Sequence, residues 1–290
     1  MLLPLAQSAG LRIEEYRCEG RTAEKDERND RHEIVFVRRG AFQVDSERGS
    51  ALVDSQRLLL FHRGERFRVR HPAGCGDRCL VLGFDDALLA ELLGAAAIDD
   101  LRPEAPFRNL TLPCTRALHA AADRLRERLR DAPGDPLVAA EELLALAARA
   151  LGATEPTVAA SPSGGLATTE LAEAVRLELA RRLGERQTLA ELGRAVGLSP
   201  FHLARRFRVA TGSSIHQYRL ELRLREAQAR LREGERDLTA LALDLGFADH
   251  AHFTNAFRRR YGVAPSRMRD ATRPAPLSAP RPTRLPRGAA

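Results

Sequence analysis

The last third of the chain contains a degenerate internal repeat, which constrains the possible fold more than any other feature of the sequence. With a shift of 49 residues, four positions fall on four similar ones: Leu189, Leu192, Val196 and Gly197 on Leu238, Leu241, Leu245 and Gly246. With a shift of 50 residues, three more positions match: Leu203, Phe207 and Gly212 on Phe253, Phe257 and Gly262. Each copy reads as a short amphipathic helix, a glycine turn, a second helix and a glycine stop, so the repeat predicts two similar helical units.

Local capping signals indicate that each unit is a helix-turn-helix. The run Thr188–Glu191 has the spacing of a capping box, and Gly197 stands where a left-handed residue would end the first helix. The Ser199–Pro200 step then supplies an N-cap and a proline at the first helical position. Residues 215–232 carry an apolar helical stripe between the units, and we expect one long helix there that acts as a rigid spacer.

The second helix of each unit has one face that remains available for contacts outside the chain. Leu203 and Phe207 are four residues apart and are expected to anchor one helix in its core, as Phe253 and Phe257 anchor the other. The outward positions are then Phe201, Ala204, Arg205 and Arg208 in the first unit, and His250, Ala251, Thr254, Asn255 and Arg258 in the second.

Positive charge is concentrated in the rear part of the chain. The formal net charge is +7, residues 168–270 hold 19 arginines against 13 acidic residues, and residues 271–290 hold four arginines and no acid. The front part must therefore be slightly acidic. This distribution favours a polyanionic partner for the rear part only, although a generally arginine-rich composition would give the same counts.

The front of the chain, to about Leu82, has the alternation typical of short β-strands. In the run 32–39 the even-numbered residues share one face and the odd-numbered residues the other, and Gly40 permits a tight turn before the next strand. Further strands are expected at Ala41–Val44, Leu58–His62, Glu65–His71 and Cys79–Phe84. Short strands separated by glycine turns predict a small barrel or sandwich.

Two helices and a linker follow the strands. Residues Thr115–Arg130 and Leu137–Leu151 each have an apolar stripe, and we expect them to form a helical hairpin that packs on the strands or across a dimer. Residues 152–167 are rich in small and polar residues and are predicted to link a first domain, 1–151, to a second domain, 168–270. Residues 271–290 contain five prolines and are predicted to be a disordered tail.

Cysteine usage and hydropathy place the chain in the cytoplasm. The four cysteines have irregular spacing without a zinc-finger pattern, so no disulfide framework is expected. The first residues lack the basic segment and long apolar run of a signal peptide, and no stretch approaches 18 uninterrupted apolar residues. We therefore expect no membrane association.

The rear part resembles the DNA-binding region of the AraC/XylS family of bacterial transcription regulators. The resemblance covers residues 168–270 and rests on the run from Gly246 to Pro265 and on the run from Leu198 to Phe207. It implies that the second helix of each unit enters a major groove of double-stranded DNA, and that the long helix holds these two helices about one DNA turn apart.

The same resemblance implies roles for individual residues. Base contacts would fall on Phe201, Ala204 and Arg205 in the first unit and on His250, Ala251, Thr254 and Asn255 in the second, with Arg208 as a further DNA contact. Arg205 is the candidate for a bidentate contact to guanine, and Asn255 could bind adenine. Arg258, Arg259 and Arg260 would contact phosphates. We expect the first unit to supply most of the sequence discrimination.

The front part resembles the cupin-like sensor domain that precedes many such DNA-binding units. The resemblance rests on Val37–Phe42, on Leu58–His62 and on the run from His71 to Cys79. It implies a small β-barrel that binds a small-molecule effector, with candidate effector-binding residues His32, Phe36, Arg38 and His71.

A metal-dependent cupin enzyme fused to a DNA-binding module is the alternative interpretation of the front part. Catalytic cupins bind metal through a His-x-His pair, a glutamate and a later histidine. His32 and Glu33 could converge with His62 and His71, but the second histidine of the pair is absent and His32 and Glu33 point to opposite faces of a strand. We therefore expect no metal, no cofactor and no enzymatic activity.

Cys18 and Cys79 lie in segments that we expect to be adjacent strands. They either form a disulfide, sense oxidants or are ordinary buried thiols, and a reducing cytoplasm favours the last of these.

Together these patterns predict an α+β protein: a small cupin-like β-barrel with a helical hairpin, followed by an all-α domain with two helix-turn-helix units. The predicted function is a sequence-specific transcription regulator with a small-molecule effector. The implied partners are double-stranded DNA, RNA polymerase and a second copy of the chain, bound through Thr115–Leu151.

Overall fold

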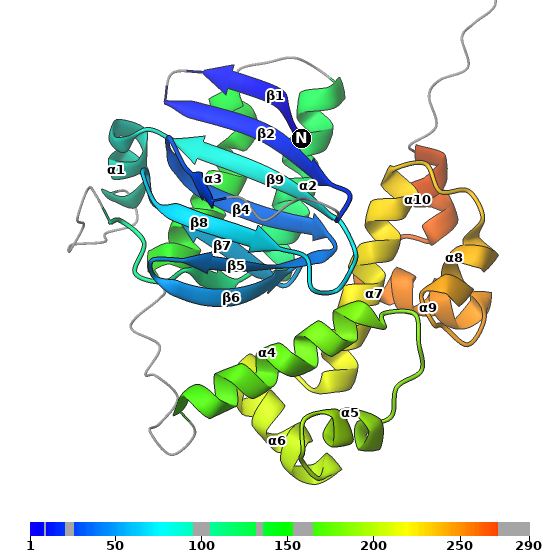
Figure 1. Cartoon of the computed structure of the whole chain (residues 1–290). Coiled ribbons are helices and arrows are strands. Elements are labelled where there is room, and N and C mark those ends of the chain that lie inside the picture. The colour runs from blue at the N-terminus through cyan, green and yellow to red at the C-terminus, as the bar shows by residue number, and fades with distance from the viewer. Residues whose placement is uncertain (9, 21–25, 95–104, 132–135, 153–164, 272–290) are drawn as a thin grey trace, which may run out of the picture.

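The computed structural model describes residues 1–8, 10–20, 26–94, 105–131, 136–152 and 165–271. All but the first residue of the predicted tail, 271–290, and most of the predicted linker lie outside these residues. The front of the described chain forms two β-sheets covered by helices, and the rear part is helical (Figure 1). No described helix is both long enough and apolar enough to cross a membrane.

Ten strands of the described residues form two antiparallel sheets. The first sheet has the order β1 (Leu2–Ser8), β2 (Leu11–Cys18), β9 (Asp77–Phe84), β4 (His32–Arg39), β7 (Arg57–Phe61) and β10 (Thr111–Pro113). The second sheet has the order β3 (Asp26–Arg28), β8 (Arg66–Arg70), β5 (Ala41–Ser46) and β6 (Gly49–Asp54). Strands are present in all five predicted segments, while β1, β2, β3, β6 and β10 are additions to the prediction.

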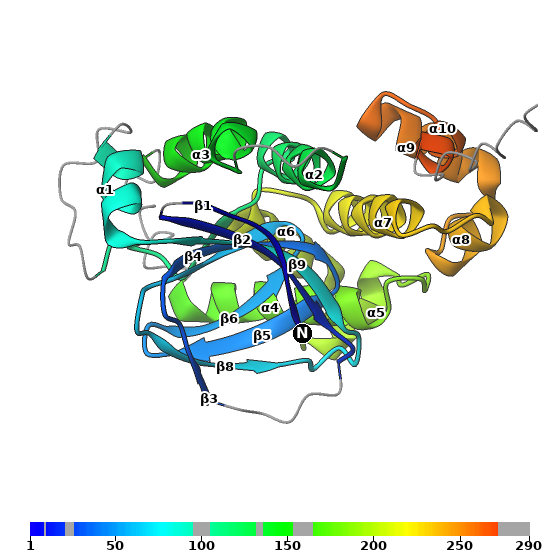
Figure 2. The same cartoon turned by 90° about the horizontal axis from the view of Figure 1, so that it is seen from above.

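Three layers result from the two faces of the six-stranded sheet. One face packs against α1 (Asp86–Gly94), α2 (Arg116–Asp131) and α3 (Pro136–Gly152), and the other faces the four-stranded sheet (Figure 2). On β4, Ile34 and Phe36 are buried under the helices, whereas Val35 and Val37 are buried between the sheets. Burying each such side chain contributes roughly 1.5–3 kcal/mol to folding.

The two sheets form a sandwich, which corrects the expectation of a small closed barrel. Among the described strands, the hydrogen-bonded order of each sheet ends in free edges and no strand pairing joins the sheets. The chain passes between the sheets through tight turns, one of them at Gly40, which has φ 81°. A Cβ at Gly40 would lie 2.0 Å from the carbonyl oxygen of Gly76, so this turn requires glycine.

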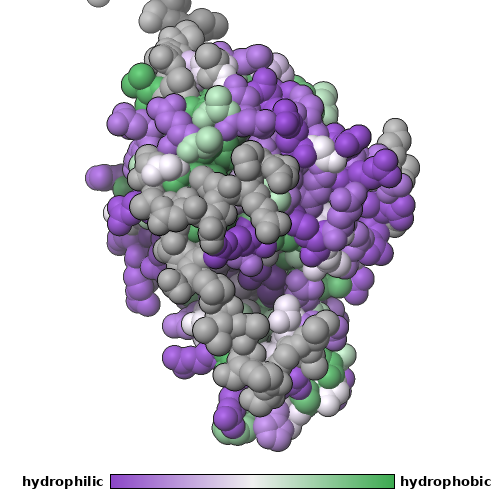
Figure 3. Space-filling model, turned by 90° about the vertical axis from the view of Figure 1, so that its left-hand side faces the viewer, coloured by the Kyte–Doolittle hydropathy of each residue, from purple (hydrophilic) through white to green (hydrophobic). Residues whose placement is uncertain are grey.

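The apolar stripe of α2, which suggested a dimer contact, is buried within the chain. Leu118, Ala121, Ala122 and Leu125 are at most 2% exposed and belong to the core between α2, α3 and the six-stranded sheet. On the side of the molecule that lies to the left in Figure 1, hydrophilic side chains predominate and hydrophobic areas are small (Figure 3). A homodimer stays a prediction, without support from this stripe.

The rear part contains the two predicted helix-turn-helix units. Their elements are α4 (Gly165–Arg181), α5 (Leu189–Ala195), α6 (Pro200–Thr211), the long α7 (Ile215–Arg232), α8 (Leu238–Asp244), α9 (His250–Tyr261) and α10 (Pro265–Ala271). The expected caps are present: Thr188 forms a capping box with Glu191, and Gly212 and Gly262 end α6 and α9 in the left-handed conformation. Each unit has its own hydrophobic core.

Candidate functional site

Helices α6 and α9 have the same pattern of exposure along their lengths. Residues 201–210 and 251–260 match position by position in being exposed, half-buried or buried. Leu203, Phe207, Phe253 and Phe257 are all 0% exposed and anchor the two helices. The sequence repeat is therefore matched in the structure: α6 and α9 expose the same side of the helix to solvent, and corresponding residues occupy corresponding positions on it.

Most of the predicted contact residues lie on the exposed faces of these helices. Phe201 is 73% exposed and touches only the ring of its neighbour His202 among the described aromatic rings. Seven other predicted residues are also exposed: Arg205, Arg208, His250, Ala251, Asn255, Arg258 and Arg259. Ala204 and Thr254 are half-buried, and the hydroxyl oxygen of Thr254 is inaccessible to solvent, so these two positions face the helix border.

Arg260 lies away from this face, contrary to its predicted phosphate contact. Its guanidinium is bound to Glu221 of α7, with Nη2 2.7 Å and Nε 2.9 Å from carboxylate oxygens. Burial alone raises the pKa of Glu221, but hydrogen bonds from Arg260 and the charges of Arg225 and Arg260 lower it to about 2. Arg260 thus fixes α9 to α7, and position 260 corresponds to the half-buried Ala210 in the first unit.

The two helix-turn-helix units are held together by α7, by hydrogen bonds from its Arg223 to the backbone of both units, and by a close backbone contact. The guanidinium of Arg223 donates to the carbonyl oxygens of Leu183 and Glu185 in the first unit and of Gly246 in the second, at 2.7–2.9 Å. A Cβ at Gly184 would lie 2.1 Å from the carbonyl oxygen of Asp244, so the backbone segments of the two units are in contact there. Because α7 has 18 residues, it spans about 27 Å. The spacing between α6 and α9 is therefore fixed.

The predicted effector-binding residues do not converge on one cavity. Phe36 is packed in the core under the helices, on the face of β4 opposite to the space between the sheets. His32 is 1% exposed and is bound by the backbone N–H of Arg63 and the carboxylate of Asp86. These two are core residues because the even-numbered face of β4 packs against the helical layer.

The remaining two candidates are held by acidic side chains. Arg38 is 2% exposed and bonds to Glu15 at 3.2 Å and to Asp123 at 3.3 Å. The Nε2 atom of His71 lies 2.5 Å from Oδ1 of Asp77. Among the described residues, the metal set considered for a cupin enzyme is also not assembled, because His32 and Glu33 lie on opposite faces of β4.

Two cavities lie beside these residues. A cavity of about 120 Å³ between the sheets is lined by the odd-numbered face of β4, with Glu33 and Val35, and by Phe42 and Phe61. Burial raises the pKa of Glu33 to about 7. A second cavity, of about 260 Å³, is lined by Arg38, Arg39 and Arg78 of the front part and by Leu183, Leu222 and Glu226 of the rear part. Asp77 lines both cavities.

The front and rear parts meet through buried polar groups. Each of the four hydrophobic clusters lies within one part or the other. Asp54, at the end of β6, is 1% exposed, and its Oδ2 accepts hydrogen bonds from Arg176 of α4 at 3.1 Å and from the hydroxyl of Tyr218 at 2.7 Å. Burial lowers the pKa of Arg176, but Asp54 and Tyr218 outweigh this effect and raise it.

One face of α7 provides the rest of this contact. Tyr218, Arg225 and Arg232 are seven residues apart and therefore lie on the same side of the helix. Arg225 is 2% exposed and donates to the carbonyl oxygens of Ser55 and Cys114, and Arg232 forms an ion pair with Asp123 of α2. Sequence reasoning missed these residues, although their seven-residue spacing was visible in the sequence.

All four cysteines lie outside disulfide bonds. Cys79 pairs across the β2–β9 ladder with Tyr16, and Cys18 pairs with Asp77, so the two cysteines do lie on adjacent strands as expected. Both are buried, and burial raises the pKa of the Cys79 thiol well above its usual range. A high pKa disfavours the reactive thiolate, which supports the interpretation of Cys79 as a buried thiol.

Comparison with known proteins places the rear part among transcription regulators. The family profile described as a helix-turn-helix domain matches residues 192–271. The regulatory protein SoxS of Salmonella typhimurium is 36% identical over 73 residues, which are 25% of this chain and 68% of SoxS. The transcriptional regulator GlxA of Rhizobium meliloti is 36% identical over 78 residues, which are 27% of this chain but only 24% of GlxA.

One similar solved structure spans both parts of the chain. ToxT from Vibrio cholerae O395 is 12% identical, covers 91% of this chain and 98% of its own, and has a TM-score of 0.35.

Proposed function

The chain belongs to the AraC/XylS family of transcription regulators, and from this premise we propose that it binds a specific DNA site with both helix-turn-helix units at once. The observation that carries the proposal is the matched exposure of α6 and α9 on a rigid frame made by α7, Arg223 and the contact at Gly184. Two helices held at a fixed spacing can enter two successive turns of one groove.

The exposed side chains suggest different roles for the two units. In α6, Arg205 is positioned for a bidentate contact to guanine, next to the exposed ring of Phe201. In α9, Asn255 is the candidate for a base contact, and Arg258 and Arg259 are candidates for phosphate contacts. Ala204 and Thr254 are half-buried, which makes them weaker candidates for base contacts than their exposed neighbours.

We further propose that a small-molecule effector acts through the cavity shared by the front and rear parts. This cavity is lined by Leu222 and Glu226 of α7, the same helix that spaces the two DNA-binding units. A ligand there would change the contact between α7 and the sheets, and so the fit of the units to DNA. Arg38 lines this cavity, whereas His32 and Phe36 belong to the core.

Purified full-length protein and fluorescently labelled DNA from the region upstream of its own gene provide the test. Fluorescence anisotropy at several salt concentrations should show specific binding to one segment, and Arg205→Ala should weaken that binding while leaving binding to unrelated DNA unchanged. The matched control is Arg182→Ala, an exposed arginine of the α4–α5 turn that is paired with Glu178 and Glu185. Equal effects of the two substitutions would show that α6 is not the recognition helix.

Such a function places the protein in the cytoplasm with the DNA. We propose the homodimer and the contact with RNA polymerase on the strength of the family alone. We also propose a regulator without enzymatic activity, because the similar proteins named above are regulators.

A further inference from the structure

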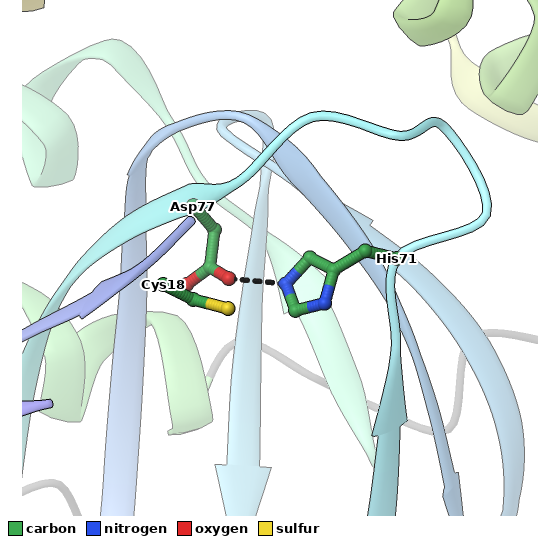
Figure 4. A group of neighbouring side chains, drawn as sticks. All are labelled: Cys18, His71 and Asp77. Atoms are coloured by element: carbon green, nitrogen blue, oxygen red, sulfur yellow. Dashed lines mark hydrogen bonds and ion pairs between the residues drawn. The ribbon is translucent and has the colours of Figure 1, made fainter. Parts of the chain in front are cut away.

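Three potential metal ligands meet near Asp77, which lines both cavities: Asp77 itself, the nearby His71, and Cys18 from a distant part of the sequence. Sγ of Cys18, an imidazole nitrogen of His71 and a carboxylate oxygen of Asp77 all lie within 4.8 Å of one another. In Figure 4 the three side chains point toward a common centre, with the carboxylate facing both the imidazole and the sulfur. We propose that these residues bind a divalent ion of the zinc class.

The donor set selects the kind of ion. A thiolate, an imidazole nitrogen and a carboxylate oxygen are ligands that Zn²⁺ and neighbouring transition metals accept, whereas Ca²⁺ and Mg²⁺ prefer oxygen ligands alone. Three protein ligands leave one position of a tetrahedral ion for water. An ion would separate Nε2 of His71 from the Asp77 oxygen to about 3.4 Å, the spacing that tetrahedral geometry implies. They are 2.5 Å apart in the hydrogen bond between them.

The backbone holds the ligands in place. Cys18 and Asp77 are direct partners across the β2–β9 ladder, so their side chains emerge on the same face of the sheet. Gly76 allows the close approach, because a Cβ there would lie 2.0 Å from the carbonyl oxygen of Cys18. His71 directly follows β8 in the other sheet. An ion would therefore join the two sheets at one end of the sandwich.

The surroundings are those of a built site and not of a surface cluster. The side chains of His71 and Asp77 are 3% and 1% exposed, and Cys18 is 5% exposed. The second oxygen of Asp77 accepts a hydrogen bond from Sγ of Cys79 at 3.2 Å, which orients the carboxylate. The residue after His71, Pro72, accepts a hydrogen bond from Nε of Arg181 at the end of α4, at 2.9 Å. The proposed site is thus one residue from a contact with the rear part.

The protein itself supplies the test, with cobalt chloride and zinc sulfate as probes and a reducing agent that does not bind metal. We expect the full-length chain to bind one Co²⁺ per molecule, with thiolate-to-cobalt charge-transfer absorption and the intense visible bands of tetrahedral cobalt, and Zn²⁺ to displace it. Zn²⁺ at 100 times its Kd should also raise the Tm by roughly 5–10 °C. If the wild-type chain shows no thiolate-to-cobalt absorption, the proposal is wrong, whether or not the protein binds DNA.

Variants then identify the ligands. Cys18→Ser should abolish the charge-transfer absorption, and His71→Gln should weaken metal binding by more than the roughly 10–100-fold that loss of an outer partner costs. Cys114→Ser and His62→Gln are matched controls, a buried thiol and a half-buried histidine outside the group, and both should retain the signal. Near-ultraviolet circular dichroism checks that each variant is folded. Retention of the absorption in folded Cys18→Ser, or its loss in folded Cys114→Ser, would refute the assignment.

Discussion

Replacing Asp54 with asparagine removes the negative charge at the centre of the contact between the front and rear parts. In the native protein one carboxylate oxygen accepts hydrogen bonds from Arg176 and Tyr218, and the other accepts one from the backbone N–H of Gln56, at 2.9 Å. Asparagine has a single oxygen, so its amide N–H groups must face either Gln56 or the pair Arg176 and Tyr218. In either arrangement the asparagine N–H groups face other hydrogen-bond donors. Arg176, which is 3% exposed, also loses the negative charge that compensates its own.

Breaking a buried ion pair in this way costs about 3–5 kcal/mol. None of the hydrophobic clusters formed by the described residues spans the contact. We therefore expect the lost free energy mainly to favour separation of the two parts, by a factor of roughly 10²–10³ or more over wild type. Hydrogen exchange followed by mass spectrometry would show it as faster exchange in β6 and α4. Asp45→Asn is the control, because Asp45 pairs with Arg70 at the surface, where such pairs contribute about 0–1 kcal/mol. If Asp54→Asn leaves exchange in β6 and α4 at the wild-type rate, these polar contacts do not hold the parts together.

Three further predictions follow from the site and the cavities. Arg205→Ala should reduce the binding free energy by about 1–3 kcal/mol for the specific site only. Arg259→Ala should weaken binding to all DNA and reduce the slope of log affinity against log salt concentration by about 1. If anisotropy titrations in KCl gave the same behaviour for both variants, the proposed base contact of Arg205 and phosphate contact of Arg259 would be refuted. Gly246→Ala should destabilise the protein more than Gly262→Ala in urea unfolding. Both glycines have φ near 70–77°, but only at Gly246 would a Cβ lie 2.2 Å from a backbone oxygen. Equal losses of stability would show that this close approach is not needed. Burial raises the pKa of Glu33 to about 7, so ionisation of this carboxyl group destabilises the fold as the pH rises above its ordinary pKa of 4.5. Glu33→Gln should therefore add up to about 3 kcal/mol to the free energy of unfolding at pH 8 and little at pH 4. An equal effect at both pH values would contradict this prediction.

The DNA-binding units could be predicted from the sequence because their signals are local. The spacing of Leu203 and Phe207, the cap at Ser199 and the glycine stops each depend on neighbours within a few residues, and the structure has the helices where these signals place them. The same local reasoning failed for Arg260, because it could not show that Glu221, 39 residues away, binds this arginine.

The front part was harder to predict because both faces of its central strand are buried. On β4 the sequence shows two apolar faces, and it does not show that Phe36 faces helices while Val35 faces the other sheet. The choice of Phe36 and His32 as effector contacts therefore rested on the wrong face. Strands β1 and β2 were missed, although β2 alternates between buried and half-buried residues over most of its length.

Buried charges were the main feature that the sequence could not reveal. Asp123 and Arg126 of α2 are charged, yet they are 3% and 4% exposed and bind Arg38 and Glu15, respectively. Arg176 meets Asp54 across 122 residues. Charged residues are usually at the surface, so only the tertiary structure identifies those that are paired inside. Only the tertiary structure also shows that Cys18, His71 and Asp77 lie together, because their spacing in the sequence matches no metal-binding motif.

Hydroxyl-radical footprinting of the full-length protein on its specific DNA site tests the central claim most directly, because it shows where each helix-turn-helix unit lies. With α6 and α9 held by α7 and Arg223, we expect two protected segments on one face of the DNA, with centres about 10–10.5 base pairs apart. Arg205→Ala should weaken protection in the segment that α6 contacts. A single protected segment, or two segments on opposite faces of the DNA, would contradict the proposal that both units bind one site at a fixed spacing.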